Sequence, residues 1–369
     1  MALMALDHAR LFVARDHPSE FWGVALPQYD GQTVPFLTRL VTHLCAPGFC
    51  FLMGVSMAML TANRQQKQGW SRGQVARYFL LRGAMLCVLQ HVVENPAWLL
   101  GNMGSAVGVE HYGVETIPGA GDNIWLHFGV LYTLGASMML WGALMWLPSA
   151  AVGVLSVLGI LASAVFLPDA SLSGEPWGAA LNLLLIPGRS QVLQVYYPLL
   201  PWAGVVGLGV LYGRGVQARP ERAFGWAAWG GAAALAVFGV VRALGGFGNH
   251  HGLSQPGWIG WLNVTKYPPS LAYLGLTLGV VGLMLAGFAL VKRRPDTNHP
   301  LMVLGQTALG FYVAHLYLYA VVGYGFAHGS SFAVLYGVWA AGLVPLYVIS
   351  RRWRAFKRAK PSQSLWRMF

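Results

Sequence analysis

The chain alternates between long apolar runs and short polar segments. In the clearest run, residues 36–62, the only basic side chains are Arg39 and His43. An apolar run of about 20 residues is long enough to cross the hydrocarbon core of a bilayer. The pattern therefore predicts an all-α, polytopic integral membrane helix bundle of about ten transmembrane helices, the first of them truncated. The predicted spans are residues 1–13, 36–62, 78–93, 124–146, 148–167, 196–212, 225–244, 270–291, 301–326 and 331–350.

The distribution of charge supports this interpretation. Only 10% of the residues are charged, against about a quarter in an ordinary soluble domain. A net charge of +12 can indicate a nucleic-acid partner, but most of the 24 Lys and Arg lie at the ends of predicted spans. The four basic clusters are residues 64–77, 214–222, 292–294 and 351–367. Basic residues in alternate loops are typical of cytoplasmic loops, so we expect no nucleic-acid partner and place both termini in the cytoplasm.

Residues 1–350 are predicted to form a single domain, and residues 351–369 a basic cytoplasmic tail that contacts anionic membrane lipid. Met1 leads directly into an apolar segment without a basic region, so no cleaved signal peptide is expected. All three cysteines, Cys45, Cys50 and Cys87, lie within apolar spans and form no CxxC pair. We therefore expect neither a disulfide nor a metal site.

Two histidines in the N-terminal region are candidate catalytic residues. Asp7 precedes His8, and a carboxylate next to an imidazole can fix its tautomer and make it a better base. A solvated dipeptide at a helix end also explains the same residues. His43 lies on a polar stripe with Arg39, next to the kink expected at Pro47-Gly48. It is either a substrate-lining residue or a histidine that bonds a neighbouring helix.

The remaining candidates are polar residues within or beside predicted spans. Arg82, close to Arg77, is placed to hold a phosphate group, although an arginine there also reaches lipid headgroups readily. Glu94 caps the outer end of the same helix and is either a second carboxylate partner for His8 or a solvated loop residue. The proposed substrate path consists of Lys266, Tyr267, Asn263 and the mid-span His315, of which the last belongs to an aromatic stripe that is otherwise typical of a helix core.

Six segments together resemble the bacterial relatives of heparan-alpha-glucosaminide N-acetyltransferase, within the wider group of transmembrane acyltransferases. The resemblance covers most of the chain. The segments are LMALDHAR (3–10), FLTRLVTHLCAPGFCFLMGVS (36–56), FLLRG (79–83), YYPLLPWAGV (196–205), LNVTKYPPSLAYLGLTLG (262–279) and LGQTALGFYVAHLYL (304–318).

The resemblance implies a bacterial inner-membrane enzyme that transfers an acyl group, expected to be acetyl, from cytoplasmic acetyl-CoA or another acyl-CoA to an extracytoplasmic sugar or glycan. It places the catalytic base at His8, and we expect Arg77 and Arg82 to bind the CoA phosphates. The animal enzyme has its active histidine farther along the following loop, where this chain offers His17. The family's Asp-x-x-Arg-Gly motif, several turns before the histidine, is missing, so we expect either an upstream start codon or a member without that arginine.

Two other classes remain open on the residues alone. A transporter or lipid-binding bundle would use the intramembrane His and Arg as a polar pathway for protons or anions. A structural subunit of an envelope-sugar assembly would bind a protein partner and no CoA. The sequence does not identify the acceptor or the acyl group, although the Gly-rich residues 225–239 would allow a homo-oligomer.

Overall fold

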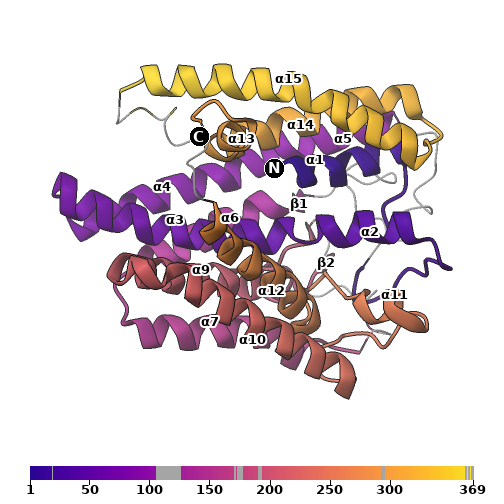
Figure 1. The fold of residues 1–369 in the computed structure, drawn as a ribbon, viewed down its shortest axis with the longest axis horizontal. Helices are drawn as coiled ribbons and strands as arrows, with labels where there is room; N and C mark the ends of the chain where they lie inside the picture. The colour runs from indigo at the N-terminus through magenta and orange to yellow at the C-terminus, as the bar shows by residue number, and fades with distance from the viewer. Residues whose placement is uncertain are drawn as a thin grey trace.

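The computed structural model describes residues 1–18, 20–104, 126–169, 172, 178–189, 193–291, 296–361, 364 and 366. Its long helices run side by side along one direction (Figure 1). The helices of the N-terminal half are α1 Ala2–Ala9, α2 Thr33–Thr42, α3 Cys45–Gln68, α4 Arg72–Leu89, α5 Asn95–Met103, α6 Val130–Leu144, α7 Ser149–Phe166 and α8 Ala179–Leu184. Those of the C-terminal half are α9 Leu199–Ala218, α10 Ala223–Leu244, α11 Gly257–Leu262, α12 Leu271–Gly287, α13 Pro300–Gln306, α14 Ala308–Val322 and α15 Phe332–Ala359.

Shorter helical turns extend several of these helices. They are the π-helical turns η1 Arg10–Ala14 and η2 Gln90–Glu94, and the 3₁₀ turns η5 Pro220–Arg222, η6 Phe288–Leu290 and η7 Gly323–Phe326. The strands β1 Leu126–Phe128, β2 Gly188–Arg189 and β3 Leu193–Val195 form a small sheet in the order β1-β3-β2. In this sheet β1 and β3 are parallel, and His127 of β1 lies opposite Gln194 of β3. Strands β2 and β3 are antiparallel.

Seven helices of the described chain are long and apolar enough to cross a membrane, and α6 is a shorter apolar helix. The longest joins α2 and α3 over Thr33–Gln68. Each of the ten predicted spans contains helix, with α1 and η1 in the incomplete first one. In the span predicted at 124–146, helix α6 begins only at Val130, after strand β1. The predicted all-α polytopic membrane bundle is confirmed. Helix α15 runs on to Ala359, into the segment predicted as the basic tail.

Glycines allow the closest helix contacts in the bundle. A methyl group on Gly54 of α3 would lie 2.0 Å from the carbonyl oxygen of Val206, and one on Gly209 of α9 would lie 2.0 Å from that of Phe51. Gly83 of α4 and Gly135 of α6 face each other in the same way. Because lipid gives apolar helices no hydrophobic reason to associate, such close backbone packing supplies much of their attraction.

The substitution Gly209→Ala should therefore destabilise the bundle by about 1–3 kcal/mol, because its methyl group would overlap the backbone of α3. Thermal unfolding of the detergent-purified protein measures the effect. Gly239→Ala is the matched control, since a methyl group there meets nothing within 4 Å. Equal melting temperatures for the two variants would contradict the packing argument.

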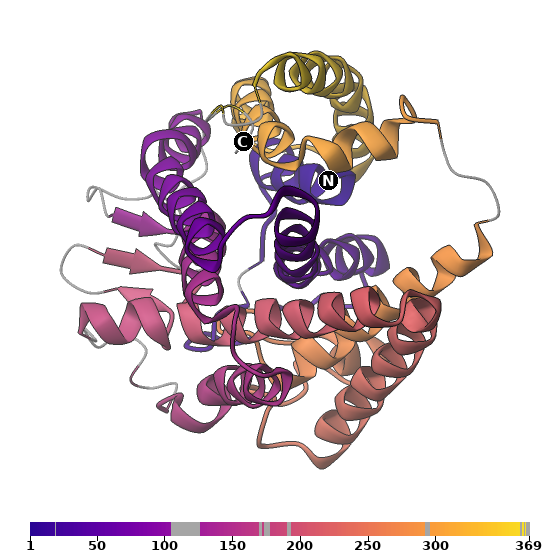
Figure 2. The ribbon, with the colours of Figure 1, turned by 90° about the vertical axis from the view of Figure 1, so that its left-hand side faces the viewer.

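The two ends of the bundle differ in character. In Figure 1 the turns from α3 to α4 and from α9 to α10, which carry basic clusters, lie at the left. The loop before α2, helix α11 and the small sheet lie at the right. Helix α1 packs against α2, α14 and α15, and Figure 2 shows it between the C-terminal helices and α2–α3. Its polar residues are therefore held inside the protein.

Candidate active site

The site begins at the break between α2 and α3, which Pro47 causes. A proline has no N–H, and its ring collides with the carbonyl group four residues earlier, here that of His43. The freed carbonyl oxygen of His43 accepts a hydrogen bond from the Tyr273 hydroxyl of α12 at 2.9 Å. The kink thus turns one backbone group of α2 toward α12, and places the His43 side chain within the bundle, where it is 2% exposed.

Arg39, one turn before His43, is the centre of a buried ionic cluster. Its Nε and Nη2 donate to the two carboxylate oxygens of Glu20 at 2.6 and 2.5 Å. Its Nη1 donates to Oδ1 of Asp7 at 2.8 Å and to Nε2 of His17 at 3.0 Å. Thr42 donates to the same Asp7 oxygen at 2.8 Å. A bidentate arginine–carboxylate pair with further hydrogen bonds is the arrangement that best offsets the desolvation of buried charge.

A loop from outside the bundle supplies Glu20. The backbone carbonyl of Glu20 accepts from the amides of Lys266 and Tyr267 at 3.2 and 3.1 Å, and the amide of Trp22 donates to the Tyr267 carbonyl at 2.8 Å. These bonds draw the loop inward until Glu20 is fully buried. Its Oε1 then lies 2.9 Å from Nε2 of His43, which donates to it.

The loop residues of the cluster have shifted pKa values. Burial alone raises the pKa of Glu20, but the charges of Arg39 and His43 outweigh this, and the net pKa lies below its usual range. Burial, and then the charge of Arg39, lower the pKa of His17. Glu20 is therefore a carboxylate and His17 a neutral ring at pH 7, as the hydrogen bonds from Arg39 require.

His8, next to Asp7 in the chain, faces a different set of groups. Its Nδ1 lies 2.7 Å from Nε2 of His315 on α14. The indole ring of Trp98 meets the His8 ring edge-on at 5.1 Å, and the ring of Tyr312 does so at 6.1 Å. Among the described residues, no group bonds Nε2 of His8. The expected partners of His8 were Asp7 and Glu94, but its hydrogen bond is to His315.

The residues predicted for the substrate path separate into two groups. Lys266 and Tyr267 adjoin the cluster: Lys266 is 4% exposed, and its Nζ lies 5.0 Å from the centre of the Tyr267 ring. Lys266 is also close enough to Asp7 to act on its charge. Asn263 instead bonds the Pro27 carbonyl and the Ser254 hydroxyl at 2.8 Å, and so holds the outer loops together.

The other three candidates lie apart from the cluster. Glu94 is buried and accepts from the indole of Trp98 at 3.1 Å, and the Trp98 ring also contacts His8. Arg82 donates to the Tyr78 hydroxyl at 3.2 Å, and its Nε is buried without a partner among the described residues. Arg77, on the same helix, is exposed.

Glu20 and Tyr273 were not expected in the site. A signal for Glu20 was present, because an arginine inside an apolar span needs a carboxylate, and the chain has only 12 acidic residues. Nothing in the sequence, however, indicated that the loop folds inward to deliver it. The part of the chain that the structure describes contains no group of three His, Cys, Asp or Glu able to hold a metal ion.

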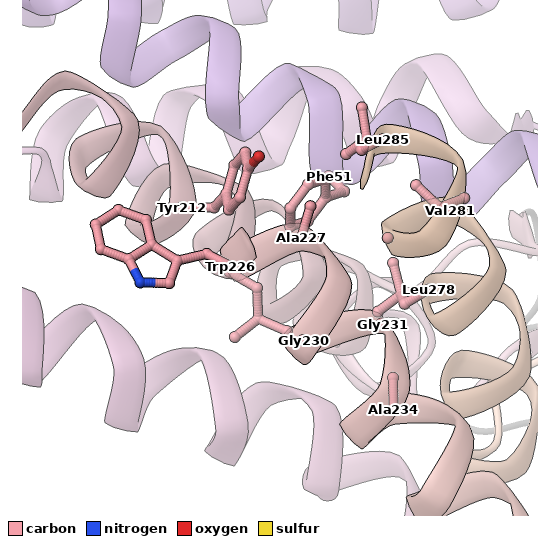
Figure 3. Close-up of a pocket in the computed structure, with 12 residues that line it drawn as sticks. Phe51, Tyr212, Trp226, Ala227, Gly230, Gly231, Ala234, Leu278, Val281 and Leu285 are labelled. Atoms are coloured by element: carbon pink, nitrogen blue, oxygen red, sulfur yellow. The ribbon is translucent and has the colours of Figure 1, made fainter. Parts of the chain in front are cut away.

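Two pockets lie away from the cluster. One, of about 200 Å³, is lined by apolar groups of α3, α9, α10 and α12, and Figure 3 shows Trp226 and Tyr212 near one end of it. It offers no catalytic side chain. The other, of about 340 Å³, lies at the basic end between α3, α9 and the turn after α6, and its lining includes Gln65, Arg214 and Gln217.

A buried ionic cluster beside a pair of histidines, inside a polytopic helix bundle, defines an integral membrane protein with the groups needed for proton transfer. The sequence profile described as "Heparan-alpha-glucosaminide N-acetyltransferase, catalytic" matches residues 24–250, more than half of the chain. The chain belongs to this family of membrane acetyltransferases. The matched region contains Arg39 and His43 and does not include His8 or His315. No curated protein matches the chain significantly.

Proposed function

We propose that the protein transfers an acetyl group from cytoplasmic acetyl-CoA, or another acyl group from its acyl-CoA, to an extracytoplasmic sugar or glycan, with His8 as the general base. The observation that carries this proposal is the state of the His8 ring. Its Nδ1 contacts His315, and no group of the described residues bonds its Nε2, which belongs to a ring close enough to the ionic cluster for the charges of Asp7 and Arg39 to act on it. Such a nitrogen is suited to remove a proton from an acceptor.

In the proposed reaction, Nε2 of His8 takes the proton of the acceptor amine or hydroxyl as that group attacks the thioester carbonyl carbon. The new C–N or C–O bond forms, the C–S bond breaks, and the CoA sulfur leaves with the bonding electron pair. The proton on His8 then passes to the thiolate, which regenerates the neutral base. Lys266 and Tyr267 line the acceptor side, and Lys266 brings a positive charge toward the oxyanion that develops.

His17 is the alternative base, because the animal enzyme's histidine lies in the corresponding loop. Its Nε2 accepts a hydrogen bond from Arg39, and an arginine can only donate. The proton of the neutral His17 ring is therefore on Nδ1, and neither nitrogen offers a free lone pair. This geometry favours His8.

The basic end of the bundle is the proposed entry side for acyl-CoA. Arg77 and Arg82 of α4 are the proposed phosphate ligands, and the Nε of Arg82, which has no partner in the described part of the chain, supports this role. The basic clusters of residues 64–77 and 214–222 and the C-terminal part of α15 lie at this end, so we place it at the cytoplasmic face of a bacterial inner membrane. The N-terminus instead lies within the bundle (Figure 1). The histidines and the outer loops then lie toward the opposite face.

Binding of acetyl-CoA should raise the melting temperature of the purified protein. At a concentration about 100 times Kd the added stability is about 2.7 kcal/mol. Arg82→Gln should reduce the shift, whereas Arg219→Gln, which removes an exposed arginine from another basic cluster, should not. A wild-type protein that shows no shift at saturating acetyl-CoA would favour the transporter, which uses the buried His and Arg as an ion pathway.

A further inference from the structure

The two imidazoles of His8 and His315 lie edge to edge in one plane. Their nitrogens are 2.7 Å apart, their ring planes differ by 5°, and their ring centres are 4.9 Å apart. For two coplanar rings whose nitrogens face each other, the distance between the ring centres is the nitrogen–nitrogen distance plus one ring radius on each side. The observed separation matches this sum, so the rings lie edge to edge and are not stacked face to face. An in-plane contact of this kind is a well-aligned hydrogen bond.

The direction of this hydrogen bond follows from the group that faces the other nitrogen of His315. Nδ1 of His315 lies 2.9 Å from the backbone carbonyl oxygen of Phe311, one turn earlier on α14. A carbonyl oxygen only accepts, so Nδ1 of His315 carries a proton. Nε2 of the neutral His315 ring is then an acceptor, and Nδ1 of His8 must be the donor. When His8 is neutral, its lone pair is therefore on Nε2.

We propose that His315 is the positioning residue of the catalytic base: through a chain that ends at the Phe311 carbonyl, it fixes the tautomer and the ring plane of His8. This inference rests on the proposed function, in which His8 is the base. It gives His315 a role in place of lining the substrate path. The side chains first expected to orient His8 are engaged elsewhere, Asp7 with Arg39 and Glu94 with Trp98.

The chain of hydrogen bonds also determines where the reaction's proton goes. An amide carbonyl does not take up a proton in this pH range, so the chain His8–His315–Phe311 has no outlet at its far end. The proton that His8 accepts on Nε2 must therefore leave from Nε2, which makes the same atom the donor to the departing thiolate. His315 orients the base and does not relay its proton.

His315 is well placed to hold this arrangement rigidly. It is fully buried, and the ring of Phe311 lies 5.3 Å from its own, at 22° between the planes. With His315 neutral and held in this way, His8 can bond it in one arrangement, in which Nδ1 of His8 donates to Nε2 of His315. The corresponding loss of a tautomer-fixing partner in a serine protease lowers kcat by about 10⁴-fold while the geometry stays intact.

Two substitutions of His315 separate positioning from packing. His315→Leu fills similar space but removes the acceptor, so it should lower kcat for acetyl transfer by about 10²-fold and leave KM for acetyl-CoA near the wild-type value. His315→Gln retains an acceptor oxygen near the position of Nε2 and should recover most of that loss. Equal kcat values for the Leu variant and the wild type, both folded, would overturn the proposal.

A spectroscopic measurement tests the same point without any turnover. Nitrogen-15 NMR of the histidine-labelled protein in liposomes should show the proton on Nδ1 in both rings, with the signals assigned from His8→Asn and His315→Gln. A proton on Nε2 of neutral His8 overturns the positioning role, even if the protein is an active transferase. The Nδ1 tautomer in a protein that transfers no acetyl group would support the positioning role while the proposed function fails.

Discussion

Replacing His8 by alanine is expected to lower the turnover of acetyl transfer by about 10²–10⁴-fold, the usual contribution of a general base. The acceptor must lose its proton as it attacks the thioester, and the variant lacks the base proposed to take it. The affinity for acetyl-CoA should remain, since the proposed phosphate ligands lie on α4. Initial rates and the acetyl-CoA-dependent melting shift of the purified variant measure both quantities.

Two further histidine variants make this result specific. His328→Ala removes an exposed ring and should leave the rate at the wild-type value. His17→Ala tests the alternative base, and a loss larger than that of His8→Ala would transfer the role to His17. A folded His8→Ala variant that works at the wild-type rate would contradict the assignment.

Glu20→Gln is expected to destabilise the protein by about 3–5 kcal/mol, because it leaves the buried Arg39 with only one carboxylate partner. The amide keeps the size of the side chain, so the loss comes from the charge and not from a cavity. Asp30→Asn is the control: this carboxylate is exposed in the same loop, and its loss should change the unfolding free energy by less than about 0.5 kcal/mol. Similar losses for both variants would contradict a specific role of the buried cluster.

The same substitution should alter the dependence of stability on pH. The pKa of Glu20 in the folded protein is below its ordinary value. Its stabilising contribution is therefore complete above the ordinary pKa of a glutamate, and is lost as the pH falls through the lowered one. Glu20→Gln lacks this contribution at every pH. The difference between the unfolding free energies of the wild type and the variant should therefore become smaller as the pH is lowered.

The helical architecture could be predicted because it depends on local properties of the sequence. Span length follows from bilayer thickness, and the ends follow from basic clusters, so each predicted span contains helix in the structure. The break at Pro47 could be predicted for the same reason, since a proline disrupts the hydrogen bond of the carbonyl group four residues earlier. The family assignment also followed from local segments, and the profile match agrees with it.

The partners within the site could not be predicted, because they depend on contacts between distant segments. Asp7 and Glu94 were chosen as partners for His8 for their proximity in sequence or helix position, whereas His315 is 307 residues away. Glu20 is not a candidate on the sequence alone, because it lies in a polar loop where an acidic residue usually remains solvated. The bonds of its backbone to Lys266 and Tyr267, and of its side chain to Arg39 and His43, show in the structure that the loop folds inward.

The most direct test of the account is acetyl transfer across a sealed membrane. Liposomes containing the purified protein would be loaded with a panel of amino sugars and short glycans, and labelled acetyl-CoA would be added outside. The account predicts labelled, acetylated sugar inside the vesicles, at a rate that falls at least about 10²-fold with His8→Ala. It would be contradicted if folded wild-type protein left all the label on CoA, or if His8→Ala transferred it at the wild-type rate.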